Sequence, residues 1–455
     1  MNTHADRIRL ILTRGPAGAR QILQNLGNIS QPTLSRALAA LGDEVVRWGA
    51  ARSIQYALRD LGRGVGDVPV FRVGADGAVK PLGVLVPVRP DGFVMRQTDG
   101  VSLHSDSLPW WLLDMRPQGF LGRAYVAQHA QALGLPPSLS DWRDAHALRA
   151  LMARGHDAVG NLLLGDGARD QFLHSPVPEP IAQAQKGEYY ARLAEAAARG
   201  DPPGSSAGGE QPKFTAYAQT TEGPRHVLVK FSLPDGAAAN PITQRWRDLL
   251  LAEHHALQNL VTAGVPAART EVVDHDGQRF LEVERFDRVG ALGRRGVFSL
   301  AALEAEFVGD APAPWPSLAA RLASPGEGAG LIDGASAQRA ALLYAYGTLV
   351  GNTDMHNGNL SFTSEHGRPY TLAPAYDMLP MGFAPRASGA LPTQIPPARL
   401  HASVDNATWH QALPLAEQFL ARLQAETRFS AGFAPCIDHL SRHIQDARTR
   451  VARLG

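Results

Sequence analysis

The sequence predicts an α+β chain that starts with a winged helix-turn-helix domain and continues into a larger, two-lobed body. Three observations support this prediction: helical spacing of apolar residues in the first 62 positions, alternation of apolar and polar residues over 66–135, and a mostly helical pattern from residue 291 onward. The chain has 455 residues, and 44% of them are hydrophobic. It can therefore bury more than one core, which excludes a disordered or fibrous protein.

The near-zero net charge of the whole chain gives no indication of a nucleic-acid partner. Lysine and arginine number 44 against 43 acidic residues, so such an argument has to be local. The single cysteine, Cys436, has no partner for an intramolecular disulfide. No apolar stretch approaches the roughly 18–20 residues that span a bilayer, and the apolar run near the N-terminus is too short for a signal peptide. We therefore expect a soluble, cytoplasmic protein with no membrane partner.

Residues 1–65 are predicted to form the winged helix-turn-helix domain. Three short helical blocks that end in glycine precede two short strands around Gly49. Residues 5–62 carry eight arginines and four acidic side chains, a local excess that suits contacts with DNA phosphates. A small helical module that docks on protein is the alternative. The third helix would present the side chains that can reach bases or phosphates: Ser30, Gln31, Thr33, Ser35 and Arg36.

The remaining chain divides into three predicted parts. Residues 66–175 form a β-rich subdomain, 176–290 a lobe with a Gly-rich loop and a strand lysine, and 291–455 a helical lobe. The Pro- and Gly-rich stretches PVPEP and GDPPGSSAGG bracket a single predicted helix, and they place the main boundary just before it.

Lysine is rare in this chain, and this makes Lys230 informative. Only four of the 44 basic residues are lysines: Lys80, Lys186, Lys213 and Lys230. The strand HVLVKFS places Lys230 among apolar residues, where its charge needs an anionic partner. Nucleotide phosphate would serve, helped by a helix carboxylate, for which Glu253 is the natural candidate. An edge strand with the lysine in solvent is the alternative.

Two further segments are consistent with a nucleotide site. GSSAGGEQPKF, residues 204–214, can present backbone amides to phosphate, although Glu210 and Gln211 stand where a P-loop needs Lys and Ser/Thr. A flexible linker is the alternative for this segment. FLEVERFDR predicts a strand that ends in a hinge, where backbone groups near Glu284 and Phe286 could bind an adenine edge. An ordinary hairpin strand explains it equally well.

The most specific motif is YGTLVGNTDMHNGNLSF, residues 346–362. Asp354, followed five residues later by Asn359, fits a phosphotransferase loop in which the Asp handles the hydroxyl proton and the Asn binds a metal. Asp377 in YTLAPAYDMLP follows a short β segment, where a second metal-binding carboxylate belongs, and such oxygen donors suit Mg²⁺. A dinuclear site built on His356 and a solvated Asx turn are the alternatives.

These motifs, in this order, resemble the HipA family of serine/threonine kinase toxins over roughly residues 66–450. The segments that carry the resemblance are SAGGEQPKF, VLVKFS, the helix with Glu253, FLEVERFDR, GNTDMHNGN and APAYDMLP. The resemblance implies a two-lobed, protein-kinase-like α+β fold. The added N-terminal domain is similar to the YjjJ (HipH) branch, in which a toxin-like chain carries its own DNA-binding module.

The resemblance also implies roles for individual residues. Lys230 would contact ATP phosphates, Asp354 would be the catalytic aspartate, and Asn359 and Asp377 would hold Mg²⁺. Ser206, or its neighbour Ser205, matches the serine that family members autophosphorylate, which ejects the loop and turns activity off. The other residues implied at the ATP site are Glu253, Glu284, Phe286, Gly208, Gly209, Gln211, Lys213 and His356.

The expected function is therefore that of a HipA-type toxin of a type II toxin–antitoxin system, an ATP- and Mg²⁺-dependent protein kinase that binds DNA through residues 1–65. The partners that the resemblance implies are a protein substrate, with aminoacyl-tRNA synthetases as candidates, and an antitoxin. A DNA-binding regulator that senses nucleotide without phosphotransfer is the first alternative. A small-molecule phosphotransferase is the second.

Overall fold

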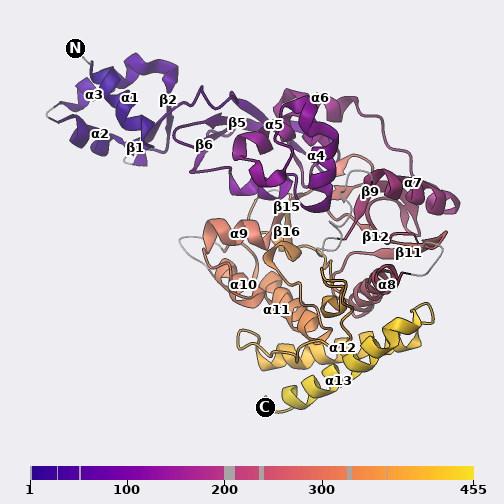
Figure 1. The fold of residues 1–455 in the computed structure, drawn as a ribbon. Helices are drawn as coiled ribbons and strands as arrows, with labels where there is room; N and C mark the ends of the chain where they lie inside the picture. Colours follow the sequence, from indigo (N-terminus) through magenta and orange to yellow (C-terminus); the bar gives the residue numbers. More distant parts are fainter. Residues whose placement is uncertain are drawn as a thin grey trace. The chain divides into compact units, whose positions relative to one another are not determined.

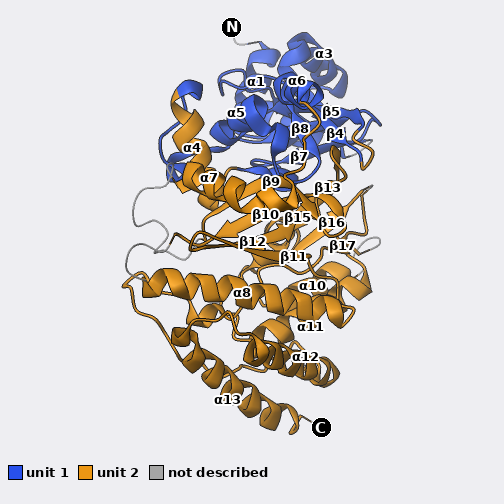
Figure 2. Cartoon of the chain, turned by 90° about the vertical axis from the view of Figure 1, so that its right-hand side faces the viewer, with its two compact units in different colours: residues 1–74, 78–116, 132–175 blue, residues 75–77, 117–131, 176–455 orange. Residues whose placement is uncertain are grey.

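A computed structural model describes the chain except at residues 1–2, 28, 51–52, 199–210, 235–239, 325–329, 366 and 455. The chain forms two compact units (Figure 2). The first comprises residues 1–74, 78–116 and 132–175, and the second 75–77, 117–131 and 176–455. The expected boundary before residue 176 coincides with a division between the units. The boundaries expected after residues 65 and 290 have no counterpart in this division and stay predictions.

The first unit begins with three helices and a three-stranded antiparallel sheet, which has the order β1-β3-β2. Ser30 begins α3 as its N-cap, because its hydroxyl accepts a hydrogen bond from the Thr33 amide. Buried Ile8, Leu12 and Ile22 form the core between the helices. The elements are α1 (His4–Thr13), β1 (Ala17–Gly18), α2 (Ala19–Leu26), α3 (Gln31–Leu41), β2 (Val45–Trp48) and β3 (Gln55–Leu58).

A five-stranded antiparallel sheet of order β7-β6-β5-β4-β8 forms the rest of the first unit. It packs against the preceding small sheet, because Val46 and Ala57 share a core with Val86, Val88 and Val94. The elements are β4 (Val68–Val73), β5 (Val79–Pro87), β6 (Phe93–Gln97), β7 (Ser102–Ser105), α5 (Asp144–Arg154), β8 (Leu162–Leu164) and α6 (Gly165–His174).

A four-stranded antiparallel sheet of order β11-β12-β10-β9 lies between two helices in the second unit (Figure 2). Tyr190 of α7 packs on one face with Phe214 and Phe231, and Leu250 of α8 packs on the other with Leu281. The elements are α4 (Gly119–Leu133), α7 (Lys186–Ala198), β9 (Lys213–Thr220), β10 (Gly223–Phe231), α8 (Pro241–Thr262), β11 (Thr270–His275) and β12 (Gln278–Glu284).

The remainder of the second unit is mostly helical, and α11, α12 and α13 pack on one another (Figure 1). A short sheet of order β15-β16-β17 contacts α9 through β15 and α11 through β17. None of the described helices is long and apolar enough to cross a membrane. The elements are β13 (Arg288–Val289), β14 (Gly293–Arg294), β15 (Gly296–Ser299), α9 (Leu300–Phe307), α10 (Trp315–Ala323), α11 (Gly334–Leu349), β16 (Ser361–Ser364), β17 (Thr371–Leu372), α12 (Asn406–Ala425) and α13 (Ala434–Val451).

Candidate active site

Lys230 lies at the centre of a buried ion cluster. Its side chain is 6% exposed, and its ammonium donates to both carboxylate oxygens of Glu253, at 2.7 and 2.8 Å, and to the carboxylate of Asp377. Strand β10 supplies the lysine, helix α8 supplies Glu253, and the segment after β17 supplies Asp377. The structure thus brings together three residues that the sequence analysis placed at one site. It adds the Lys230–Asp377 contact, which the sequence analysis did not predict.

The charges in this cluster stabilise one another. Burial alone would lower the pKa of Lys230, but the carboxylates of Asp377 and Glu253 outweigh it and raise that pKa above its ordinary value. Burial also acts to raise the pKa of Asp377, and there the positive charge of Lys230 prevails and lowers it. For Glu253, which is fully buried, burial prevails and raises the pKa. The ammonium therefore stays charged, and its attraction holds Asp377 ionised.

A network of hydrogen bonds connects the Asp354 loop to Asp377. The Asp354 amide donates to Oδ1 of Asn352 at 3.0 Å, and Nδ2 of Asn352 donates to the carbonyl oxygen of Asp377 at 3.0 Å. Nδ2 of Asn359 donates to the Asp354 carbonyl oxygen at 2.8 Å. Asp377 has a φ of 53°, a left-handed conformation that is uncommon for a residue other than glycine. Asn352 holds this strained position from the side of the loop.

Asp354 itself is exposed at the surface of the loop. Partial burial raises the pKa of its carboxyl above the ordinary value, and the charge of His356 acts in the opposite direction. Nδ1 of His356 accepts a hydrogen bond from the Gly358 amide at 3.0 Å, so His356 also shapes the turn that leads to Asn359. Asp354 is therefore accessible to a substrate hydroxyl, and its environment favours proton uptake.

Tyr376 fixes the relative positions of the two expected metal ligands. Its hydroxyl donates to the Gly358 carbonyl oxygen at 2.8 Å, so the neighbours of Asp377 and Asn359 are joined directly. The described residues contain no group of three or more His, Cys, Asp and Glu side chains that could hold a metal. A carboxylate oxygen and an amide oxygen fit Mg²⁺, which takes few protein ligands and completes its shell with water and phosphate oxygens.

The segment expected to form the hinge, which contains Glu284 and Phe286, lies near Tyr376. Glu284 ends β12, and its carboxylate pairs with Nε of Arg225 at 3.2 Å. The ring of Phe286 lies 5.6 Å from that of Tyr376, measured between centroids. Phe286 therefore lies near Asp377, on the chain segment that follows the four-stranded sheet.

The structure describes only part of the expected Gly-rich loop. Ser205, Ser206, Gly208 and Gly209 lie outside the described residues. Gln211 is buried, and its Nε2 has no hydrogen-bond partner within the part of the chain that the structure describes. The last residue of the motif, Lys213, stands directly opposite Lys230 on the neighbouring strand.

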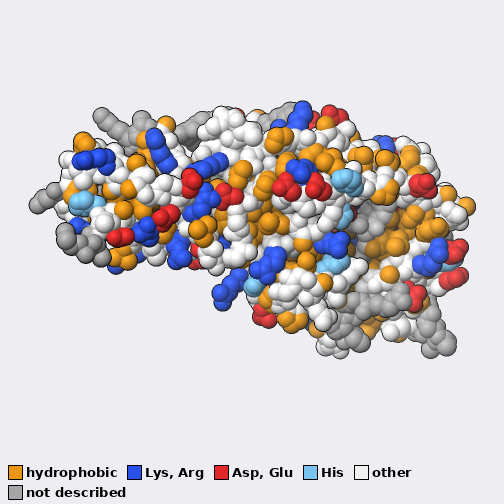
Figure 3. Space-filling view, turned by 90° about the horizontal axis from the view of Figure 1, so that it is seen from above, with side chains coloured by type: hydrophobic (Ala, Val, Ile, Leu, Met, Phe, Trp, Pro, Cys, Tyr) orange, Lys and Arg blue, Asp and Glu red, His pale blue; other side chains and the backbone are white. Residues whose placement is uncertain are grey.

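The side chains expected to contact DNA lie on α3. Ser30, Gln31, Ser35 and Arg36 are exposed, and Thr33 is partly buried, its amide donating to the Ser30 hydroxyl. Basic and acidic side chains are interspersed on the face of the molecule shown in Figure 3, consistent with the near-zero net charge.

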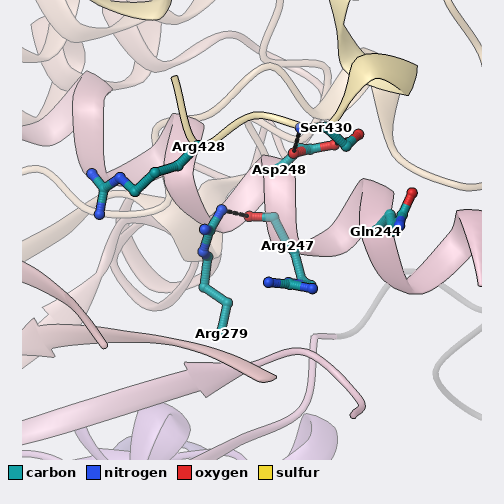
Figure 4. A pocket seen from close by; sticks show the side chains of 6 residues that line it. All are labelled: Gln244, Arg247, Asp248, Arg279, Arg428 and Ser430. Carbon is teal, nitrogen blue, oxygen red and sulfur yellow. Dashed lines mark hydrogen bonds between the residues drawn. The ribbon is translucent and has the colours of Figure 1, made fainter. Parts of the chain in front are cut away.

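A separate pocket, which the sequence analysis did not find, opens beside α8 (Figure 4). Its volume is about 190 Å³. Two of its three arginines are paired with carboxylates in a bidentate manner, Arg279 with Asp274 and Arg428 with Glu426. These carboxylates offset the positive charge, so the pocket does not present a strong anion site. The lining residues are Gln244, Arg247, Asp248, Arg279, Arg428 and Ser430.

Comparisons with known proteins identify the family of this chain. Residues 65–173 match the YjjJ-like toxin middle domain, and residues 205–448 match the HipA-like C-terminal domain. The chain therefore belongs to the HipA family of toxins. It is 39% identical over 447 residues to Toxin YjjJ of Escherichia coli (strain K12), covering 98% of each chain.

A solved HipA structure shows the same fold. HipA of Shewanella oneidensis MR-1, determined in a complex with HipB and operator DNA, is 16% identical with a TM-score of 0.56 over 85% of this chain and 99% of that chain. The Helicobacter pylori proinflammatory kinase CtkA is 13% identical over 55% of this chain and 94% of its own, with a TM-score of 0.37. The expected HipA-type, kinase-like α+β fold is confirmed.

Proposed function

We propose that this chain is an ATP- and Mg²⁺-dependent protein serine/threonine kinase. The observation that carries the proposal is the buried Lys230–Glu253–Asp377 cluster, which Asn352 connects to the exposed Asp354. A buried, doubly paired lysine beside an accessible aspartate suits phosphoryl transfer, in which the protein mainly positions the reactants and stabilises charge.

In the proposed reaction, Lys230 neutralises charge on the nucleotide phosphates, and Glu253 holds that lysine in place. Asp354 orients the substrate hydroxyl and accepts its proton as the oxygen attacks the terminal phosphorus, while ADP leaves with the bond electrons. Asn359 and Asp377 would hold Mg²⁺, which supplies further positive charge for the phosphates. Glu284 and Phe286 would meet the adenine at the hinge.

The first experiment measures phosphate gained by the purified chain after incubation with Mg·ATP, by intact-mass and peptide mass spectrometry. We expect one phosphate on Ser206 or Ser205 and none in the Asp354→Ala variant. Asp438→Ala changes an exposed aspartate of α13 and is the matched control, which should gain phosphate as the parent chain does.

Other outcomes would point to other functions. ATP binding without phosphate on the chain or on any protein would favour the nucleotide-sensing regulator. Transfer only to small hydroxyl compounds would favour the small-molecule phosphotransferase. Phosphorylation by Asp354→Ala at the parental rate would contradict the role given to Asp354.

We further propose that α3 binds DNA, with Arg36 contacting phosphate and Gln31 a base edge. Deleting residues 1–65 is a poor test, since it would expose Val86, Val88 and Val94 of the neighbouring sheet. Arg36→Ala in the full chain should instead weaken DNA binding and reduce its dependence on salt. Arg453→Ala, at an exposed arginine near the C-terminus, is the matched control. Unchanged affinity and salt dependence in Arg36→Ala would contradict the assignment of α3.

The proposed partners follow from the same family. The Shewanella relative was solved with HipB and operator DNA, and we propose a comparable antitoxin and operator for this chain, in the cytoplasm. The proposed substrate is a protein, with aminoacyl-tRNA synthetases as first candidates. Incubating purified synthetases with this chain and labelled ATP tests the choice, and label on none of them would exclude this class.

A further inference from the structure

The segment between α9 and α10, residues 308–314, is attached at two points to the loop that carries the candidate catalytic aspartate. Nδ2 of Asn357 donates to the carbonyl oxygen of Ala311 at 3.2 Å, and Nε1 of Trp315 donates to the carbonyl oxygen of His356 at 3.3 Å. Trp315 is the first residue of α10 and is 1% exposed, so the core of the helical part holds this end of the segment. Segment 308–314 therefore keeps a fixed position beside that loop.

Contacts with the two flanking helices make segment 308–314 rigid. In α9, Oε1 of the buried Glu304 accepts from the Asp310 amide at 2.5 Å, and the Glu304 carbonyl oxygen accepts from the Gly309 amide at 2.9 Å. In α10, Arg321 pairs with Asp310 at 3.0 Å and donates to the Val308 carbonyl oxygen at 3.2 Å. A surface that is already ordered loses less conformational entropy when a partner binds to it.

The outer surface of segment 308–314 is small and open. Gly309, Ala311 and Pro312 are exposed. Gly309 has a φ of 70°, a left-handed conformation that favours glycine, and a Cβ there would meet no atom of the described residues within 4 Å. Small residues let the backbone of a second chain approach closely, which suits a polypeptide in an extended conformation.

The loop that carries Asp354 has two sets of contacts. One set leads through Asn352 to Asp377 and hence to the place proposed for the nucleotide, and the other leads through Asn357 to segment 308–314. In phosphoryl transfer the attacking and leaving oxygens lie roughly in line with the phosphorus. Because the leaving ADP would occupy the place beside Asp377, the acceptor hydroxyl has to approach the exposed Asp354 from another direction. Segment 308–314 is an exposed, rigid surface that the second set of contacts holds close to Asp354.

From these contacts we infer that segment 308–314 binds the polypeptide around the acceptor hydroxyl of a protein substrate. The inference rests on the proposed function and names the surface that receives the substrate of that reaction. The substrate chain lies in an extended conformation over Gly309, Ala311 and Pro312, and it presents a serine or threonine hydroxyl to Asp354. The class of substrate that fits this surface is a polypeptide, because a small hydroxyl compound would not extend over it.

Phosphate transfer from the full chain to a second protein molecule tests the inference. The acceptor probe is the Asp354→Ala variant, which keeps Ser205 and Ser206 but lacks the candidate catalytic aspartate. In the phosphorylating chain, Ala311→Arg places a long side chain over the segment and should raise KM for the acceptor about 10- to 100-fold, while KM for ATP stays within about twofold. Ala311→Gly keeps the surface small and should behave as the parent does. Ala320→Arg, at an exposed position of α10, is the matched control and should leave both KM values unchanged.

A second variant tests the attachment of the segment. Asn357→Ala removes the bond to the Ala311 carbonyl oxygen and should also raise KM for the acceptor more than KM for ATP. Calorimetric titration with the non-hydrolysable β,γ-imido analogue of ATP checks that nucleotide affinity in both variants stays within about twofold of the parent. If each molecule phosphorylates only itself, the rate of that reaction replaces KM, and Ala311→Arg should slow it by the same factor.

The outcomes separate the inference from the proposed function. Transfer by Ala311→Arg with the parental KM for the acceptor, or at the parental rate of self-phosphorylation, would overturn the inference and leave the proposed kinase intact. Equal rises in both KM values would assign the segment a structural role and also overturn it. If the parent chain phosphorylated neither itself nor the acceptor probe, the proposed function would fail, and the inference with it.

Discussion

At the scale of single residues, Asn352 is the polar side chain that couples the two halves of the candidate site. It accepts from the Asp354 amide and donates to the Asp377 carbonyl oxygen, both at 3.0 Å, and it is 4% exposed. Asn352 is uncharged, and these bonds join it to the backbone of Asp354 and Asp377, not to their carboxylates. In the proposed reaction, Asn352 therefore positions Asp354 and Asp377, which come from two separate segments of the chain.

We expect Asn352→Ala to lower kcat about 100-fold while KM for ATP changes little, because small misplacements of reacting groups affect the chemical step most. Steady-state phosphorylation kinetics measure this split. Asn406→Ala, at the exposed first residue of α12, is the control. A larger rise in KM than fall in kcat would show that Asn352 serves nucleotide binding instead of positioning.

The lowered pKa of His254 predicts how the free energy of unfolding depends on pH. Burial, followed by the charges of His255 and Arg428, lowers the pKa of His254 to about 4 from the ordinary 6.5. The unfolded chain therefore binds the proton first as the pH falls. The stability that the neutral imidazole contributes is complete above about pH 6.5 and is lost toward pH 4, up to about 3 kcal/mol.

Urea unfolding at a series of pH values measures this dependence. His254→Gln keeps a side chain that can bond to the Thr270 hydroxyl, as His254 does at 2.9 Å, and should flatten the curve between pH 6.5 and 4. His410→Gln, at an exposed position of α12, should leave the curve unchanged. The expectation fails if both variants retain the full acid-induced loss.

Sequence reasoning anticipated the partner of Lys230 on α8 and did not anticipate its contact with Asp377. Glu253 follows Lys230 by 23 residues, and a strand followed by an amphipathic helix brings such positions together. Asp377 is 147 residues away, and its approach depends on a left-handed backbone and on Asn352. The spacing of apolar residues indicates neither the left-handed backbone at Asp377 nor the hydrogen bonds of Asn352. Tyr376 was missed for the same reason, although an aromatic residue next to a candidate metal ligand was the available signal.

At the scale of secondary structure elements, α7 is attached to its sheet by a buried ion cluster. Lys186 is 1% exposed and donates to Glu271 at 3.0 Å and to Glu282 at 2.9 Å, and the Tyr190 hydroxyl donates to Glu282 at 2.7 Å. Burial raises the pKa of Glu282 despite these partners. The cluster therefore fixes α7 in position at the cost of desolvating its charges.

Lys186→Met should lower the free energy of unfolding by about 3–5 kcal/mol, because it leaves Glu282 buried without its cation. Chemical denaturation measures the loss. Replacing both partners, with Lys186→Met and Glu282→Leu, should recover most of the stability, since the desolvated charge is then gone. A double variant as unstable as the single one would show that packing, not charge, holds α7.

The elements that sequence reasoning missed are those whose local pattern is ambiguous. Residues 119–133 lie within the stretch expected to be β-rich, and they form helix α4. Three leucines at 162–164 form strand β8. A run of three apolar residues fits either structure, and β8 is defined by its pairing with β4. Helix α10 begins with Trp315, and Pro316 stands in its first turn, where a proline is tolerated.

At the scale of the whole molecule, the chain passes between its two compact units more than once. The segment 117–131, which includes most of α4, belongs to the second unit although residues on both sides of it belong to the first. Phe120 of this segment packs edge-on against Phe231, with 6.4 Å between ring centroids, in the core that also contains Phe214. A fragment that starts at residue 176 would therefore lack part of its own core, and a test of the units requires the full chain.

Because the two units have separate cores, we expect calorimetry of the full chain to resolve two unfolding transitions. Phe120→Ala removes a ring that is 3% exposed and should destabilise the second unit by about 3–5 kcal/mol, shifting one transition to lower temperature. Leu34→Ala, in the core of the three N-terminal helices, should shift the other transition. In sequence, Phe120 lies between two segments of the first unit. A division of the chain at residue 176 would therefore assign Phe120 to the transition of the first unit. A single transition that both variants shift to lower temperature would show that the two units unfold together.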